Sequence, residues 1–338
     1  MKYLLNKYKI FLIIYLPIFI FLVVIGTYKT NYSVTTTGSI TKISSYIDVD
    51  TDNKSGDINS VFVYSLDHST IFQNWCGKLD KNAEVEKLSK NYSKFSQSEL
   101  SLMGKIQHNQ SIESSVIRAY SYAKESDDSI SIDYEFKGLI VNYLIISDDM
   151  QFKIGDIITS INGYSSYEEM KNEYKNMYEG SNVEVLRGNE KLIFTLNSSS
   201  SIYILDEKKY SHISVYDKFE IKSTTPKIKI SSINSSGPSA GLMQTIAIYN
   251  MLTENDITAG KRISGTGTID VLSNVGEIGG IKEKIVAAFK MKVDIFLCPE
   301  ANYEDAMNQY NKLGKKKYRL KIYSLSTFEE ALEVLYNA

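Results

Sequence analysis

The sequence of 338 residues is short of cysteine, proline and net charge, and each shortage excludes a class of protein. Its two cysteines, Cys76 and Cys298, exclude a small fold stapled by disulfides, and no Cys/His cluster has the spacing of a structural zinc site. A formal net charge of −2 excludes a strongly basic nucleic-acid-binding protein. Four prolines beside 43% hydrophobic residues exclude a disordered or collagen-like chain. We therefore expect a globular protein of about two or three domains, with no nucleic acid or metal bound.

A charge-free apolar run from Ile10 to Tyr28 dominates the N-terminus. At about 1.5 Å per residue, the run as a helix spans roughly 28 Å, close to the hydrocarbon thickness of a bilayer. Three lysines among the first nine residues precede it, so the positive-inside rule predicts a cytoplasmic N-terminus and an extracellular remainder. A cleaved signal peptide is the alternative. The length of the run and the poor cleavage site at Gly26 favour an uncleaved, single-pass transmembrane helix.

The rest of the chain alternates between strand-like and helix-like stretches. Residues 31–75 alternate β-branched and polar residues, which predicts short strands. Between residues 84 and 126, apolar residues recur at helical spacing. The segments that follow also contain both strand-like and helix-like patterns. The expected fold class is therefore α+β, after an N-terminal transmembrane helix.

Residues 130–197 form a compact unit of strands around one helix. It begins with the apolar strand Gly138-Leu139-Ile140-Val141, continues through a G-D-x-I-x-x-I-N-G run that starts at Gly155, and ends with a helix and two strands. The Asn-Gly pair in the run predicts a tight turn, because both residues accept positive φ. These features resemble a PDZ domain of the bacterial protease-associated kind, and an unrelated small β-unit is the alternative. The resemblance implies that Gly138, Leu139, Ile140 and Val141 bind a peptide as an added β-strand.

The motif with the clearest chemistry is Gly237-Pro238-Ser239-Ala240-Gly241, between a predicted strand and an apolar helix. A serine at such a turn has its hydroxyl beside the free N–H groups of a helix start, which can stabilise a developing oxyanion. We expect Ser239 to be a nucleophile, with the backbone of Gly237, Pro238 and Ala240 around the oxyanion and the substrate. The alternative is that Ser239 only caps the helix. The lack of Glu or Gln at position 242 slightly weakens this alternative.

A serine nucleophile needs a base. The three histidines, His68, His108 and His212, lie in no motif that suggests catalysis. The other route is a Ser–Lys dyad, in which burial lowers the pKa of a lysine until the amine can accept the hydroxyl proton. Lys282 and Lys284 both lie on a predicted helix that follows a glycine pair. Each shares a helix face with apolar residues, so periodicity leaves both open.

Four segments of the C-terminal third together resemble the proteolytic domain of the Lon peptidase family. The resemblance implies that Ser239 is the nucleophile, that Lys284 is the catalytic lysine, and that Thr266 holds the lysine amine. Ser236 departs from the family, because many members have Asp before G-P-S. No G-x-x-x-x-G-K-[ST] motif occurs, so no ATP and no other cofactor is expected. The segments are Gly237-Pro238-Ser239-Ala240-Gly241, Gly265-Thr266-Gly267, Gly276-Glu277-Ile278-Gly279-Gly280-Ile281-Lys282-Glu283-Lys284 and Pro299-Glu300.

The order of anchor, PDZ-like unit and Lon-type domain resembles the Gram-positive membrane-anchored PDZ–Lon peptidases (the SepM/YlbL-like group). This implies an ATP-independent serine endopeptidase that cleaves extended peptides or disordered protein segments outside the cell. The alternative is a non-catalytic surface module that binds peptides or acts as a chaperone. The expected divisions are 1–30 (N-terminus and anchor), 31–125 (packed with the C-terminal domain or standing alone), 126–200 (PDZ-like) and 201–338 (Lon-type).

Overall fold

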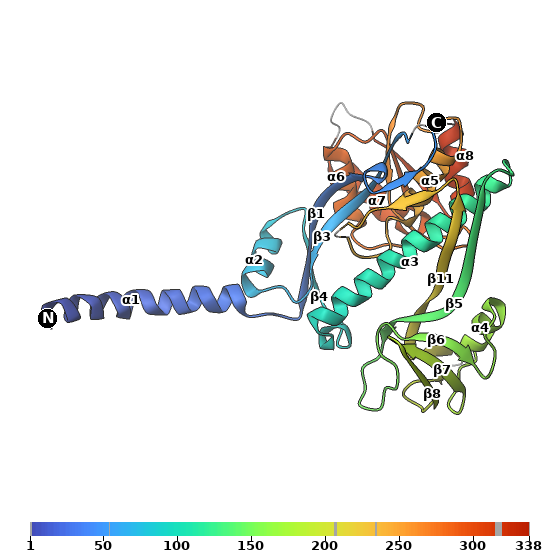
Figure 1. Cartoon of the computed structure of the whole chain (residues 1–338). Coiled ribbons are helices and arrows are strands. Elements are labelled where there is room, and N and C mark those ends of the chain that lie inside the picture. The colour runs from blue at the N-terminus through green and yellow to red at the C-terminus, as the bar shows by residue number, and fades with distance from the viewer. Residues whose placement is uncertain (1, 54, 206–207, 234, 315–319, 338) are drawn as a thin grey trace.

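The computed structural model describes residues 2–53, 55–205, 208–233, 235–314 and 320–337, except for the side chains of residues 2–7, 10 and 12. The chain forms a helical rod at its N-terminus, a main body, and a smaller β-rich unit beside that body (Figure 1). This mixture of helices and strands agrees with the predicted α+β class.

A six-stranded sheet in the order β17-β16-β13-β3-β1-β4 supports the main body. Three of its strands come from the N-terminal third of the chain and three from the C-terminal third. β3 and β13 join the two sets as parallel neighbours. The strands are β1 (Tyr32–Lys42), β3 (Asp57–Leu66), β4 (Glu84–Lys87), β13 (Arg262–Gly265), β16 (Ile295–Pro299) and β17 (Lys321–Leu325).

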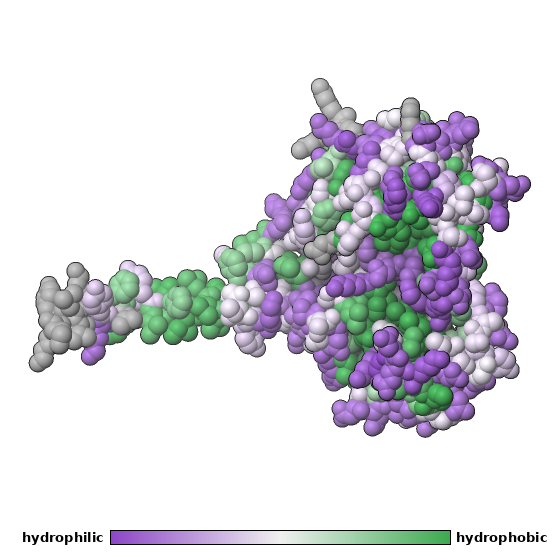
Figure 2. All heavy atoms as spheres, viewed as in Figure 1, coloured by the Kyte–Doolittle hydropathy of each residue, from purple (hydrophilic) through white to green (hydrophobic). Residues whose placement is uncertain are grey.

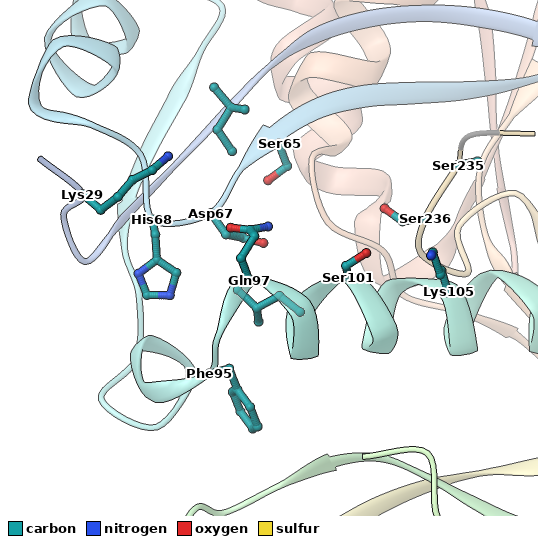
Figure 3. Close-up of a pocket in the computed structure, with 12 residues that line it drawn as sticks. Lys29, Ser65, Asp67, His68, Phe95, Gln97, Ser101, Lys105, Ser235 and Ser236 are labelled. Carbon is teal, nitrogen blue, oxygen red and sulfur yellow. The ribbon is translucent and has the colours of Figure 1, made fainter. Parts of the chain in front are cut away.

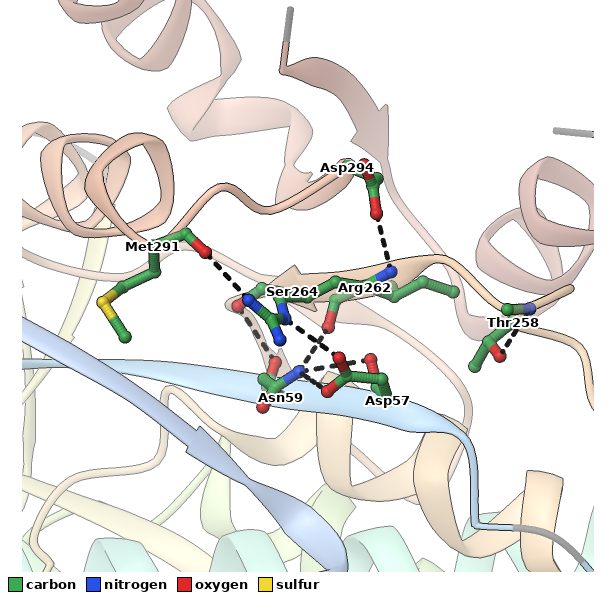
Figure 4. A network of polar contacts seen from close by, with 9 residues as sticks. Asp57, Asn59, Thr258, Arg262, Ser264, Met291 and Asp294 are labelled. Atoms are coloured by element: carbon green, nitrogen blue, oxygen red, sulfur yellow. Dashed lines mark hydrogen bonds and ion pairs between the residues drawn. The ribbon is translucent and has the colours of Figure 1, made fainter. Parts of the chain in front are cut away.

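Polar side chains reinforce the junction between β3 and β13 (Figure 4). The Arg262 Nε–H donates to Asp57 Oδ2 at 2.9 Å. Ser264 Oγ donates to the carbonyl of the buried Asn59 at 3.1 Å. Residues 31–125 therefore do not stand alone. They pack with the C-terminal domain, which is the first of the two arrangements considered from the sequence.

Two helices pack against each other in the core of the main body, α3 (Gln97–Lys124) and α5 (Gly241–Leu252). Ser96 and Glu99 form a capping box at the start of α3. Every residue of α5 is buried, because α3, α8 and strands of the body surround it. The other helices of the body are α6 (Ile281–Lys290), α7 (Glu300–Lys312) and α8 (Phe328–Asn337). Its short strands are β2 (Ile47–Val49), β12 (Ile228–Ile230), β14 (Thr268–Ile269) and β15 (Val275–Gly276).

The smaller unit is an antiparallel sheet in the order β11-β5-β6-β7-β8, with α4 (Tyr167–Tyr174) packed against it. β5 (Ser131–Leu144) and β11 (Ile213–Thr225) form a long ribbon that connects this unit to the main body (Figure 1). The predicted division at residue 200 is wrong, because Ile202 and Ile213 belong to the core of this unit. The remaining strands are β6 (Ile157–Ile161), β7 (Asn182–Arg187), β8 (Glu190–Thr195), β9 (Ile202–Leu205) and β10 (Lys208–Ser211).

The predicted peptide-binding edge of this unit is not free. Gly138, Leu139, Ile140 and Val141 lie in the middle of β5, and β11 pairs with all four. On the other side, β6 pairs with Leu139 and Ile140. The prediction is wrong because a strand from much later in the chain fills the position beside the local motif.

The N-terminal helix α1 (Lys2–Thr27) projects from the body, and the described side chains along its middle are apolar and exposed (Figure 2). A short helix, α2 (Ile71–Leu79), packs near its C-terminal end. Among the side chains that the structure describes, no helix reaches both the length and the hydropathy of a membrane span. The predicted anchor over residues 10–28 includes positions 10 and 12, whose side chains lie outside the described set.

Candidate active site

Helix α3 holds the loop that carries Ser239. Gly237 in this loop has a φ of +84°, a conformation that favours glycine. Its N–H donates to the Gly104 carbonyl of α3 at 2.9 Å, and Ser111 Oγ donates to the Pro238 carbonyl at 3.0 Å. Residues two turns apart on α3 thus fix the backbone immediately before the serine.

The segment that follows β13 holds Ser239 from the other side. The Ser239 carbonyl accepts a hydrogen bond from the Gly267 N–H at 2.9 Å and another from Thr266 Oγ1 at 3.0 Å. Two donors on one carbonyl fix the peptide group that follows Ser239, and the backbone position fixes where its Cα–Cβ bond points. Ser239 itself is only partly buried, which leaves room for a substrate to reach it.

Lys284 supplies the base. It lies in the first turn of α6, after Gly280 with a φ of +68°. Its Nζ lies 2.8 Å from Ser239 Oγ and 2.8 Å from Thr266 Oγ1. The residue is 2% exposed, and this burial lowers the pKa of the amine from 10.5 to about 7. Near neutral pH much of the amine is therefore uncharged and able to accept a proton.

Thr266 orients the amine of Lys284. The Thr266 hydroxyl uses its own proton on the Ser239 carbonyl, so only its lone pairs face the lysine. The amine must then donate an N–H to Thr266 Oγ1. That leaves the nitrogen lone pair available for the Ser239 hydroxyl, 2.8 Å away.

The environment of Lys282 decides between the two lysines. Its side chain is 43% exposed, and its Nζ lies 3.3 Å from the Glu84 carboxylate. Glu84 raises the pKa of Lys282, which keeps that amine protonated. Lys284 is therefore the dyad lysine that the geometry supports, and Lys282 is a surface charge.

The backbone donors around Ser239 differ from those predicted. The Gly237 N–H is already used on Gly104, and Pro238 has no N–H, so neither can stabilise an oxyanion. Within the described part of the chain, the N–H groups of Ser239 and Ala240 donate to no acceptor. Ala240 precedes α5 as its N-cap, where the helix dipole also favours negative charge. Of the three predicted positions, Ala240 alone has a free donor.

The dyad opens into a cavity of about 460 Å³ between β3 and the loop that carries Ser239. A second pocket of about 760 Å³ continues from it toward the end of α1 (Figure 3). The two share Ser65, Ser235 and Ser236, so they form one groove along β3.

Sequence reasoning missed His108 and Ser111 on α3. His108 lines the catalytic cavity and is 8% exposed, and its burial lowers its pKa. Ser111 supports the loop of the nucleophile. Both are polar residues on the largely apolar, buried face of α3. Polar residues at such positions are a signal in the sequence that could have marked the part of α3 that faces the site. Within the described ranges, no group of three or more His, Cys, Asp and Glu side chains could hold a metal ion.

The geometry agrees with a comparison to known proteins. Residues 196–338 match the family described as the Lon protease (S16) C-terminal proteolytic domain. The chain contains a Lon-type serine peptidase domain. In the fold, this domain also includes β1, β3 and α3, which lie outside the matched residues.

Lon proteases from several bacteria resemble the same part of the chain. The Campylobacter jejuni Lon protease is 31% identical over 130 residues, which cover 38% of this chain and 15% of that protein. The Chlamydia pneumoniae Lon protease is 31% identical over 102 residues, covering 30% and 12%. The Haemophilus influenzae Lon protease is 32% identical over 126 residues, covering 37% and 13%. The chain thus matches at most 15% of the length of these relatives.

Proposed function

We propose that this chain is a serine endopeptidase that uses a Ser–Lys dyad and works without ATP. The observation that carries the proposal is the 2.8 Å separation of Lys284 Nζ and Ser239 Oγ, with the amine buried and its pKa lowered to about 7. The absence of a G-x-x-x-x-G-K-[ST] motif from the sequence supports a reaction that needs no ATP.

In the proposed reaction, the neutral amine of Lys284 takes the proton from Ser239 Oγ as this oxygen attacks the scissile carbonyl carbon. The carbonyl oxygen becomes an oxyanion and accepts a hydrogen bond from the Ala240 N–H. The Lys284 ammonium then gives its proton to the leaving amine as the C–N bond breaks. A water molecule, deprotonated by Lys284, hydrolyses the acyl-enzyme and restores both side chains.

The edge of β3 supports an extended substrate. β13 pairs only with Asp57–Ser60, whereas Val61–Leu66 pair with β1 alone among the described strands. Val61 to Ser65 line the catalytic cavity. A peptide in an extended conformation can therefore add to this edge through main-chain hydrogen bonds, with its scissile bond beside Ser239. Peptides and disordered segments can adopt this extended conformation without unfolding, which favours them as substrates.

We also propose that α1 anchors the protein in a membrane as a single pass, with a cytoplasmic N-terminus and the peptidase domain outside the cell. The charge-free run from Ile10 to Tyr28 and the lysines before it support this arrangement. The exposure of Phe11, Ile13 and Phe19, at 55%, 68% and 63%, supports an apolar surrounding for the helix.

The smaller unit is proposed to be a PDZ-like domain inserted into the Lon-type domain, as in the SepM/YlbL-like group. Asn162 has a φ of +52°, as its Asn-Gly turn requires, and α4 follows this turn. β7 and β8 then pair as the closing hairpin.

The test is cleavage of unstructured peptides by the full chain in detergent micelles, without nucleotide, followed by mass spectrometry. We expect internal cleavage by the wild type and none by Ser239→Ala. A fluorophosphonate probe should add covalently to Ser239 in the wild type, and Lys284→Met should block this addition. Peptide binding without cleavage or adduct formation would instead support the non-catalytic peptide-binding or chaperone module.

A further inference from the structure

Helix α2 is oriented with its apolar face outward. Its C-terminal half packs against the main sheet through Gly77, where an added Cβ would lie 2.8 Å from side-chain atoms of both Val34 and Val85. On the same side, the Asn74 amide donates to Thr30 Oγ1 at 2.8 Å. The face turned toward the protein is therefore small and polar.

The opposite face carries four large apolar side chains. At 3.6 residues per turn, positions 71, 72, 75 and 79 fall within an arc of about 100°. They are exposed to 40%, 47%, 59% and 66%, so exposure rises toward the C-terminal end of the helix. These residues are Ile71, Phe72, Trp75 and Leu79. A surface helix of a soluble protein normally buries such a face, so this one needs an apolar partner.

The position of α2 identifies that partner. Thr30, which follows α1 closely, donates its N–H to the Ser69 carbonyl at 2.9 Å, and Lys29 pairs with Thr70, the N-cap of α2. The outward face of α2 thus begins at the level where the apolar run of α1 ends. Phe72 and Trp75 are the residue types that favour the boundary of a membrane, where an aromatic ring meets both hydrocarbon and headgroups.

We propose that α2 is an interfacial helix whose Ile71, Phe72, Trp75 and Leu79 side chains insert into the surface of the membrane that α1 spans. The inference rests on the proposed anchor. It adds a second contact with the membrane, beside α1, and this contact fixes the orientation of the peptidase domain relative to the membrane surface. Lys78 lies in the last turn of α2 and Lys81 just after its end, where both can meet anionic headgroups.

This contact places the substrate groove near the membrane. Lys29 lies at the end of α1 and lines the 760 Å³ pocket that continues from the catalytic cavity (Figure 3). With α2 on the lipid surface, this end of the groove faces the headgroup layer. Substrate segments that emerge from the membrane can enter it directly.

Trp75 is the sole tryptophan in the sequence, so its fluorescence reports on α2 in the unmodified chain. The full chain is reconstituted into phosphatidylcholine–phosphatidylglycerol vesicles, with or without bromine atoms near the headgroup end of the acyl chains. We expect Trp75 emission to shift to shorter wavelength in vesicles and to lose most of its intensity with brominated lipid. The double variant Phe72→Ser/Leu79→Ser should lose most of this quenching. Leu272→Ser, which changes a 70% exposed leucine elsewhere, should keep it.

Flotation of the vesicles separates this inference from the proposed anchor. If the protein floats with the vesicles but Trp75 stays unquenched, α2 is not in the interface while the anchor stands. If the protein does not float, the anchor fails and the interfacial helix fails with it. A blue shift that needs high protein concentration and no lipid would assign the α2 face to a second copy of the chain, and would also overturn the proposal.

Discussion

Strand β5 of the smaller unit and strand β3 of the main body differ in whether a neighbouring strand occupies both of their edges. In the smaller unit, Leu139 and Ile140 of β5 have hydrogen-bonded neighbours on both sides. In the main body, Val61–Ser65 of β3 have β1 on one side and the catalytic cavity on the other. The motif that resembles a peptide-binding strand therefore lies in a strand with both edges paired, and the open edge lies beside Ser239. Whether a strand has a free edge depends on the strand order of the complete sheet, because a strand from later in the chain can pair with that edge.

The largest effect should come from removing the chemistry beside the open edge. Ser239→Ala and Lys284→Met should each lower kcat by on the order of 10⁴-fold or more, because a nucleophile and its base act as one unit. Initial rates on an unstructured peptide measure this. Lys282→Met is the matched control and should retain wild-type activity, since its amine is exposed and paired with Glu84. An inactive Lys282→Met beside an active Lys284→Met would reverse the assignment of the base.

Activity should depend steeply on acidity. Lys284 must be neutral to accept the Ser239 proton, and its pKa is about 7. The rate should therefore rise with pH through about 7, and at pH 5 it should lie about 100-fold below its plateau, tenfold per pH unit. A pH–kcat/KM profile on a peptide without ionisable groups measures the midpoint. A midpoint near pH 10 would mean that burial does not lower the pKa of the Lys284 amine.

Thr266→Val should weaken the dyad without abolishing it. The variant keeps the shape of the side chain but removes the hydroxyl that orients the lysine amine and donates to the Ser239 carbonyl. We expect a decrease in kcat of about 10- to 100-fold, with little change in KM, because proton transfer depends on this geometry. Thr266→Ser should recover most of the activity. Equal loss in both variants would indicate that the methyl group matters instead.

The open edge itself can be tested through the substrate. N-methylation of one peptide amide that pairs with β3 removes a main-chain hydrogen bond, and should raise KM by about fivefold if that bond contributes about 1 kcal/mol. Methylation further from the scissile bond serves as the control. An unchanged KM for every methylated position would show that the substrate does not add to β3.

The smallest effect on catalysis should come from a change in the sheet of the smaller unit. Arg187 donates to both carboxylate oxygens of Asp156, whose side chain is 1% exposed. Arg187→Ala leaves this charge unpaired and should destabilise the smaller unit by about 2–4 kcal/mol, given the cost of breaking a buried pair. Chemical denaturation measures the loss, while cleavage of short peptides at 25 °C should be unchanged. A parallel loss of activity would mean that the two sheets unfold together.

The catalytic serine could be predicted from the sequence because its signal is local. A strand, a glycine turn and an apolar helix specify where the side chain of Ser239 lies. The choice between Lys282 and Lys284 could not be made from the helix pattern, since both share a face with apolar residues. It depends on which face meets β1 and the Ser239 loop, and that is set by packing between distant segments.

The errors have the same origin. The predicted division at residue 200 failed because β11 returns to pair with β5. The expected donor at Gly237 failed because Gly104, from a helix more than 100 positions earlier, accepts its hydrogen bond. The sequence leaves the packing of residues 31–125 open, and the pairing of β3 with β13 decides it. In each case the structure depends on a contact with a segment far away in the sequence, and such a contact leaves no local sequence pattern.

The parallel pairing of β3 with β13 has a consequence for synthesis. The wall of the cavity comes from β3, the nucleophile from the segment before α5, and the base from α6, so an unfinished chain holds no complete site. Contacts between segments so far apart in the sequence also slow folding. A growing chain therefore cannot assemble the Ser239–Lys284 pair until its last third has emerged and docked.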